Sequence, residues 1–494
     1  MNHSRWTLRY AAVAAAGMAA VAMLPGGSAA AQSTATGPTV KLITAQRQIN
    51  VPRFGKFVFM DPGVYVVAVG SALRFDVRRT SYAKAITATE IIKGAGGQIT
   101  KRPVPRREFE GWRGLRRFLR LTIRNSAGKI VGSRLTTFCP GGFNQQRSGP
   151  NSPPRSPFPF GCASNPFELG TVWGLQRGWG ADAAGFGRLR LRLGTYTLTV
   201  HVTTFWQRFL HVTSKAATAT VKIHVVKPTQ CGFPCAVRPS HRATHSGPLP
   251  SQPANVPVIS NPPVSSLPDL SPLPSWGINL FGRRNSTTQR LAFGATVWIG
   301  GHARLDVEGF RSHGAPVMKA YQYFYKNGRV VGRTRAGTMG FDGKPGHNHW
   351  HFEQFAQYRL LSANKTLVLR SRKVGFCIAP TDGIDLLLKH ALWQPKFTGF
   401  GGDCGSTSAL WVREELPLGW GDTYFQFVAG QSFNITNLPN GTYYVEIIAN
   451  PRKVLHESDY RNNVSLRKVI LGGTLGHRTV KVPAVHGIDP EHGG

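Results

Sequence analysis

The chain has 494 residues, and 41% of them are hydrophobic. A chain of this length exceeds what one hydrophobic core usually serves, so a single small domain is excluded and two domains are expected. Lys and Arg number 60 against 23 Asp and Glu, and the resulting formal net charge of +37 would draw the protein to polyanions. The sequence has no nucleic-acid-binding motif and no interleaving of aromatic and basic residues. Retention on an anionic cell-wall or surface polymer is therefore favoured over specific nucleic-acid recognition.

The first 31 residues have the pattern of a secretory signal peptide. Arg5 and Arg9 provide the charged start, residues 11–24 the apolar run, and three alanines at 29–31 a small-residue cleavage site. No later stretch is long and apolar enough to span a bilayer, so we expect an exported protein without a transmembrane anchor. The six cysteines would then form three disulfides in an oxidising compartment.

Short runs rich in Val, Ile, Thr and Tyr, bounded by Gly, Pro and Asn, predict β-strands. Helical periodicity is scarce, and the clearest helix-like run, 384–389, is too short to change the class. We therefore predict an all-β protein of two antiparallel β-sandwich domains in tandem. The strand-like runs are 64–69, 196–202, 220–226, 321–325 and 443–448.

The two predicted domains are copies of one another. Shifting the chain by 238 residues places Trp112 on Trp350 and Phe138-Cys139 on Phe376-Cys377, and further on Gly178-Trp179-Gly180 matches Gly419-Trp420-Gly421. Two copies at a long period indicate duplicated domains rather than a solenoid.

Domain bounds and cysteine pairs follow from the repeat. We expect domains at 38–227 and 267–473, a C-terminal tail at 474–494, and a linker rich in Pro and Ser at 228–266, because twelve prolines fall within 228–274. Pairing within copies would join Cys139 to Cys162 and Cys377 to Cys404, and would leave Cys231 with Cys235 in the linker.

Three histidines alternate along the stretch 346–352. In a β-strand, alternate side chains point to the same face, so the imidazoles of His347, His349 and His351 would converge on one point. Neutral nitrogen ligands without cysteine suit Cu(II), Zn(II) or Ni(II) better than Ca(II) or Mg(II). The alternative is a histidine-rich strand face that binds nothing.

The first copy lacks the residues that could carry chemistry. The histidine positions fall on Phe109, Gly111 and Arg113 under the same shift, and Lys373 falls on Leu135. When the Gly-Trp-Gly turns are superposed, Tyr424 falls on Ala183. We therefore predict that the first copy keeps the fold but has no catalytic role.

Several spaced motifs of the second copy, within about 267–471, follow one family's order. They are His347-x-His349-x-His351 with Phe355 and Tyr358, Lys373-Val-Gly-Phe376-Cys377, Gly421-Asp422-Thr423-Tyr424, Asn434-Ile435-Thr436 with Pro439-x-Gly441-x-Tyr443, and Asn450-Pro451 followed by Glu457-Ser458-Asp459-Tyr460-x-Asn462-Asn463. The second copy thus resembles the catalytic domain of the lysyl oxidase family, secreted copper amine oxidases with a quinone built from their own side chains. The first copy resembles a degenerate form of the same domain.

The resemblance implies that the three histidines bind copper and that Lys373 and Tyr424 crosslink into lysine tyrosylquinone. The quinone would condense with a primary amine, peptidyl lysine included, and a base would remove the α-proton, so that electrons flow into the ring. Hydrolysis by water would then release the aldehyde, and dioxygen would restore the quinone with hydrogen peroxide and ammonia as products. Asp422 is a candidate for that base, and the alternative is a carboxylate that caps the turn at Gly421. The alternative to an enzyme is a non-catalytic, basic surface- or wall-binding protein that holds a structural metal.

A second candidate metal site combines oxygen ligands. Asp459, Asn462 and Asn463, with Glu457 nearby, offer the ligands that Ca(II) prefers, and Asp269 could complete the set from the other end of the domain. The alternative is an acidic turn held by side-chain caps.

Overall fold

The computed structural model describes residues 39–94, 96–142, 145–183, 187–228, 252, 255–281, 288–312, 314–343, 348–395 and 404–491. The predicted signal peptide, the Cys231–Cys235 pair and His347 lie outside these residues. No helix of the described residues is long and apolar enough to cross a membrane.

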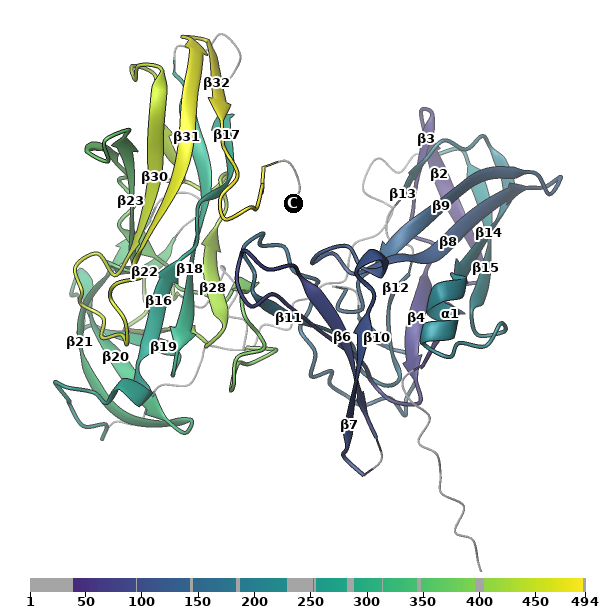
Figure 1. Ribbon diagram of the computed structural model, residues 1–494, viewed down its shortest axis with the longest axis horizontal. Helices are drawn as coiled ribbons and strands as arrows, with labels where there is room; N and C mark the ends of the chain where they lie inside the picture. The colour runs from purple at the N-terminus through teal and green to yellow at the C-terminus, as the bar shows by residue number, and fades with distance from the viewer. Residues whose placement is uncertain are drawn as a thin grey trace, which may run out of the picture. The chain divides into compact units, whose positions relative to one another are not determined.

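The protein is all-β, as predicted (Figure 1). Its one described α-helix, α1, is short (Thr204–Phe209), and the described 3₁₀ helices are η1 (Arg106–Glu108) and η2 (Val264–Ser266). The run 384–389 forms turns and no helix. The strands of the N-terminal half are β1 (Thr39–Thr44), β2 (Gln48–Phe54), β3 (Phe57–Met60), β4 (Val64–Val69), β5 (Leu73–Arg78), β6 (Thr87–Lys93), β7 (Ile99–Val104), β8 (Leu115–Asn125), β9 (Ile130–Phe138), β10 (Gln146–Arg147), β11 (Gly170–Leu175), β12 (Trp179–Asp182), β13 (Gly187–Leu189), β14 (Gly194–Val202) and β15 (Thr218–Val226).

The strands of the C-terminal half are β16 (Pro268–Pro272), β17 (Trp276–Phe281), β18 (Arg290–Gly301), β19 (Leu305–Phe310), β20 (Val317–Lys326), β21 (Arg329–Asp342), β22 (His349–Glu353), β23 (Ala356–Ser362), β24 (Leu367–Arg370), β25 (Gly375–Phe376), β26 (Asp382–Gly383), β27 (Trp411–Leu416), β28 (Trp420–Tyr424), β29 (Ser432–Asn434), β30 (Gly441–Ala449), β31 (Val464–Thr474) and β32 (His477–Lys481).

The five strand-like runs of the sequence all lie in strands, namely in β4, β14, β15, β20 and β30. In β14, β15 and β30, buried side chains alternate with half-buried or exposed ones. This period of two puts one face of each strand against a core. One hydrophobic core lies wholly within 40–225 and another within 270–482.

The order of strands in the sheets repeats between the halves. The sheet β1-β4-β12-β10 of the N-terminal half has the counterpart β16-β18-β28-β26, and the run β15-β14-β8-β9 has the counterpart β31-β30-β23-β24. Nearly all pairs are antiparallel, and the pair β15–β2 is parallel. The repeat found in the sequence is thus also present in the topology, while the division into two tandem domains stays a prediction.

The described end of the predicted linker packs against the C-terminal half. The Ile259 amide donates to the Arg333 carbonyl and the Arg333 amide to the Pro257 carbonyl, both at 2.9 Å, and Val256 is buried beside Tyr323. Residues 255–266 therefore pack as part of the second half, although the proline content of the segment favours a spacer.

The two predicted disulfides within the copies are present. Cys139 bonds to Cys162 and Cys377 to Cys404, with Cα–Cα distances of 5.8 and 5.9 Å. The equivalent positions of these bonds in the two halves follow from the repeat.

Candidate active site

Two of the predicted copper ligands lie on one strand face. Strand β22 runs between β21 and β25, and its alternation puts His349 and His351 on the same side. Their Nε2 atoms lie 2.8 Å apart, and His351 is buried with its Nδ1 atom 3.9 Å from Oδ2 of Asp342. His347 lies outside the described residues.

The spacing of the two imidazoles is compatible with a shared metal ion such as copper. Two nitrogens that bind one metal ion at about 2.0 Å and roughly at a right angle are separated by about 2.8 Å. The Nε2–Nε2 distance of 2.8 Å meets that requirement, although it also permits a hydrogen bond between a donor and an acceptor tautomer. The described residues, which exclude His347, contain no group of three His, Cys, Asp or Glu side chains placed to hold a metal.

Lys373 and Tyr424 meet in a buried site. The Lys373 Nζ atom lies 4.3 Å from the centre of the Tyr424 ring, and 9% of Lys373 and 5% of Tyr424 are exposed. The Tyr424 hydroxyl donates to the Cys377 carbonyl at 3.0 Å, and Phe376 packs edge-on against the Tyr424 ring at 5.2 Å. Burial raises the pKa of Tyr424 well above its usual value, so the phenol is neutral at physiological pH.

Strand β25 and the second disulfide connect this pair to the histidine strand. β25, which begins two residues after Lys373, pairs with β22 through Phe376 and Phe352. Across the Cys377–Cys404 bond, the Cys404 carbonyl accepts a hydrogen bond of 2.7 Å from the amide of Trp350, the residue between the two histidines. Cys377 thus contacts Tyr424 directly and the histidine strand through its disulfide.

The candidate base lies on the same side of β28 as Tyr424. Asp422 precedes Tyr424 by two residues, so both side chains point to one face of the strand. Asp422 is 1% exposed, and this burial raises its pKa well above the usual range, an effect opposed by the positive charge of Lys373.

A second buried carboxyl, Glu414 of β27, was missed in the sequence. It is 2% exposed, accepts a hydrogen bond from the Ile378 amide at 3.0 Å, and raises the pKa of Tyr424 by its charge. Burial raises the pKa of Glu414 well above its usual value. Two acidic residues interrupt the apolar pattern of 411–416, but this pattern does not show which carboxyl the strands distant in sequence bury.

The candidate calcium ligands are brought partly together. Asn462 donates from its amide to both carboxylate oxygens of Asp269 at 3.0 Å, and Asn463 donates to Oε1 of Glu457 at 2.7 Å. The Asp459 carboxylate instead accepts hydrogen bonds from the backbone and guanidinium of Arg461, as a turn cap would. Hydrogen bonds thus join Asp269 to Asn462, Asp459 is bonded to Arg461, and the calcium site stays a prediction.

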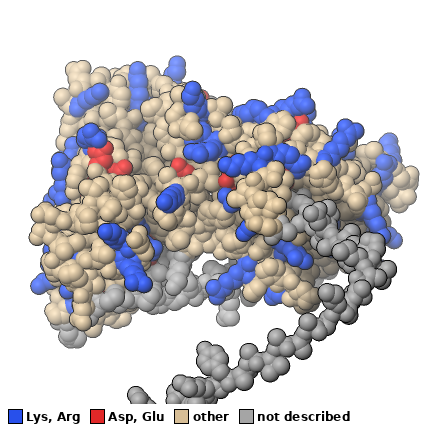
Figure 2. Space-filling view, turned by 60° about the horizontal axis from the view of Figure 1, so that its bottom comes forward, with Lys and Arg blue, Asp and Glu red and all other residues tan. Residues whose placement is uncertain are grey.

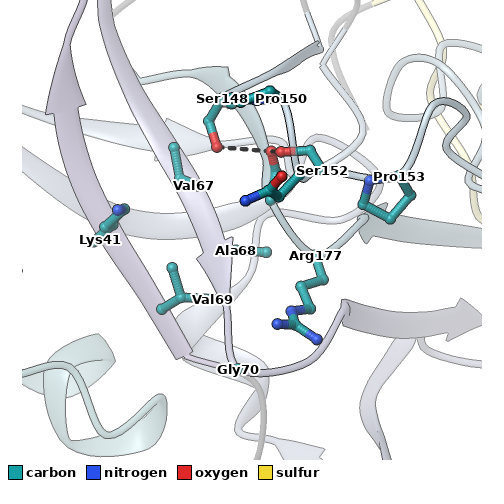
Figure 3. Close-up of a pocket in the computed structure, with 13 residues that line it drawn as sticks. Lys41, Val67, Ala68, Val69, Gly70, Ser148, Pro150, Ser152, Pro153 and Arg177 are labelled. Carbon is teal, nitrogen blue, oxygen red and sulfur yellow. Dashed lines mark hydrogen bonds between the residues drawn. The ribbon is translucent and has the colours of Figure 1, made fainter.

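A cavity of about 460 Å³ in the N-terminal half lies apart from these residues (Figure 3). Lys41 and Arg177 line it, and the Ser148 and Ser152 hydroxyls each donate to the Gly178 carbonyl at 2.7 Å. Gly178 has a left-handed φ of +75°, and its counterpart Gly419 has one of +83°, so both copies share this turn. The two serines stabilise the turn in the first copy.

The C-terminal half matches known proteins in sequence. A family model described as lysyl oxidase matches residues 322–479. Residues 322–479 form a lysyl oxidase family domain. This range contains the histidines, Lys373, Asp422 and Tyr424, and it excludes the N-terminal half and Asp269.

The matches to curated relatives cover about a third of this chain. The chain is 30% identical over 151 residues to lysyl oxidase homolog 2 of Homo sapiens and 30% identical over 150 residues to that of Xenopus tropicalis, in each case 30% of this chain and 17% or 18% of the relative. It is 27% identical to lysyl oxidase homolog 3B of Danio rerio over 167 residues, 34% of this chain and 17% of the relative. The chain therefore spans about a sixth of the length of these relatives.

Proposed function

We propose that the chain is a secreted amine oxidase that depends on copper and lysine tyrosylquinone. It would deaminate primary amines, peptidyl lysine among them, to aldehydes and release ammonia and hydrogen peroxide. The lysyl oxidase family domain supports an oxidoreductase of this general kind. The finer statement rests on the side chains of the site.

The contact between Lys373 and Tyr424 is the observation that carries this proposal. An amine 4.3 Å from the centre of a phenol ring, with both groups buried, is close enough for the nitrogen to add to the ring after oxidation by dioxygen. A structural role alone would explain a buried tyrosine more easily than a buried lysine, since an ammonium group is costly to desolvate. Both residues are absent from the copy that also lacks the histidines.

Each remaining residue has a role that its position permits. His349 and His351, with His347, would hold the copper ion, which supplies the redox chemistry that makes and restores the quinone. Asp422 would accept the α-proton of the amine. Phe376 packs on Tyr424 and limits the motion of its ring.

The non-catalytic alternative rests on charge. Lys and Arg side chains are scattered over the visible face and far outnumber Asp and Glu there (Figure 2), in line with the net charge of +37. Such a surface binds polyanions and repels cationic amines at long range. We propose that it retains the enzyme on an anionic cell-wall or surface polymer, and that the active site acts over short distances.

Visible absorption spectroscopy tests the proposal. The purified protein loaded with copper should show a quinone band that phenylhydrazine shifts, and Tyr424→Phe should lack the band. Tyr460→Phe, which alters a partly exposed tyrosine outside the site, is the matched control and should keep it. A protein with full copper occupancy and no band that phenylhydrazine shifts would support the non-catalytic alternative.

A further inference from the structure

The active-site strand β28 has its back face turned to the N-terminal half. Side chains alternate along a strand, so Thr423 points to the side opposite Asp422 and Tyr424. The Thr423 hydroxyl lies 2.7 Å from that of Thr296 on the neighbouring strand β18. Asn165 of the N-terminal half donates from its side-chain amide to the Thr296 hydroxyl at 3.0 Å.

Asn165 is held rigidly. It is 1% exposed, its side-chain oxygen accepts from the Phe167 amide at 3.0 Å, and its own backbone amide donates to Glu168 at 3.1 Å. These bonds orient the side-chain amide of Asn165 and lower the entropic cost of its bond to Thr296. Asn165 therefore transmits the position of the segment 164–170 to the threonine pair.

The same segment also holds the loop that pairs with β28. The amides of Leu169 and Gly170 both donate to the Ile384 carbonyl, at 2.7 and 3.1 Å, and the Leu386 amide donates back to the Gly170 carbonyl at 2.8 Å. A Cβ atom at Gly170 would overlap with Oδ1 of Asp385, so a larger residue there would displace this carboxylate.

Residues 382–385 of this loop in turn bond to β28 and to the residue just before it. Ile384 and Asp385 donate from their amides to the Gly419 carbonyl at 2.8 and 3.0 Å, and Asp382 pairs with Gly421. Ser164 donates to the Asp382 carboxylate at 3.0 Å, and Phe167 packs against Ile384 in a small apolar cluster. Backbone, polar and apolar contacts thus act on one strand.

We propose that the segment 164–170 positions strand β28, and that Asn165 is a positioning residue for Asp422 and Tyr424. The catalytic part of this inference rests on the proposed amine oxidase function. The N-terminal half would then lack catalytic groups and still set the rate, because displacement of reacting groups by about 1 Å can reduce a rate roughly 100-fold.

The test uses Asn165→Ala in the full chain, with Asn151→Ala as the matched control, since Asn151 is an exposed asparagine of the same half. We expect kcat for a small amine to fall roughly 10- to 100-fold with KM nearly unchanged. Hydrogen exchange of the backbone amides at 419–425 should accelerate, while exchange at 441–449 should not change. Asn151→Ala should alter none of these quantities.

Two further variants keep the test decisive. Ser164→Ala removes one hydrogen bond at a partly exposed position and should give a smaller change of the same kind if Asn165→Ala does not fold. Thr296→Val combined with Asn165→Ala should reduce kcat no more than the more damaging single change, because both act through the same hydroxyl. If the two changes reduce kcat additively in free energy, Asn165 does not act through the Thr296 hydroxyl.

Hydrogen exchange separates the inference from the proposed function. Faster exchange at 419–425 in a protein whose wild type oxidises no amine would refute the function and support the positioning of β28. Unchanged exchange and kcat in a folded Asn165→Ala variant of an active enzyme would overturn the inference alone.

Discussion

Lys373 and Tyr424 are 51 positions apart in the chain, and local contacts bring them together. Tyr424 ends β28 and donates its hydroxyl to Cys377, while Lys373 lies just before β25 and the same cysteine. The backbone amide of Lys373 also donates to Ser371 at 3.1 Å, which fixes the turn that directs its side chain inward. The pair is therefore positioned by the residues around Cys377.

The first prediction at this scale concerns copper. His349→Ala removes one nitrogen of a pair 2.8 Å apart and should abolish copper retention, because the remaining imidazoles cannot complete the ligand set. Elemental analysis after dialysis measures the copper that each variant retains. His477→Ala, at an exposed histidine, is the control and should retain the ion. Full copper occupancy in His349→Ala would show that the ion binds elsewhere.

The residues of the site were predictable in part. Alternation placed His349 and His351 on one face, and the repeat singled out Lys373 and Tyr424 because the first copy lacks both. Glu414 was not found, since burial of a carboxyl depends on strands distant in sequence that cover it. Asn165 was not predictable either, because its partner Thr296 lies 131 positions away.

At the scale of elements, each disulfide occupies the same place in the repeated topology and has a different neighbour. Cys377–Cys404 brings the Cys404 carbonyl to the amide of Trp350 on the histidine strand. Cys139–Cys162 lies in the half that has Phe109, Gly111 and Arg113 in place of histidines. The two bonds therefore offer a comparison within one chain.

The second prediction uses that comparison. Replacing Cys377 and Cys404 by Ala should lower the free energy of unfolding by roughly 3 kcal/mol and should also weaken copper retention, since the histidine strand loses its tether. Replacing Cys139 and Cys162 should cost about as much stability and leave copper bound. Chemical denaturation and elemental analysis measure both effects. Equal copper retention in the two variants would refute a role of the second disulfide at the site.

The third prediction concerns calcium, which we propose binds at Asp269, Asn462 and Asn463. The side-chain oxygens of both asparagines are buried and have no hydrogen-bond partner in the described part of the chain, which leaves them available to a cation. Calcium at about 100 times its Kd should stabilise the protein by about 2.7 kcal/mol, measured as a rise in Tm. Asp269→Asn should abolish the rise and Glu108→Gln should not. A rise that survives in Asp269→Asn would place the ion elsewhere.

The strands were more predictable than the contacts among them. All five runs rich in Val, Ile, Thr and Tyr form strands, because a half-buried strand needs this alternation whatever it pairs with. The end of the linker was less predictable. Proline content at 255–266 suggests an extended spacer, and extended chain can equally pack on a sheet edge, as the bonds to Arg333 show.

At the scale of the whole molecule, charge dominates. The fourth prediction is that the protein binds an immobilised anionic polymer such as dextran sulfate and elutes only at high salt, because screening removes the attraction. Replacing the exposed Arg116, Arg117 and Arg120 by Glu should lower the eluting salt concentration. The same change at Lys326, Lys365 and Arg370 of the second half is the control. An equal shift in both would show that net charge alone decides retention.

Peptide mapping of the copper-treated, aerated protein tests the central claim most directly. The fifth prediction is a crosslinked peptide that contains both Lys373 and Tyr424. The reason is that the Lys373 Nζ atom already lies 4.3 Å from the centre of the Tyr424 ring and both side chains are buried. This peptide should be absent from Tyr424→Phe and from Lys373→Ala. Recovery of both residues in unmodified linear peptides from protein that oxidises amines would contradict the quinone assignment.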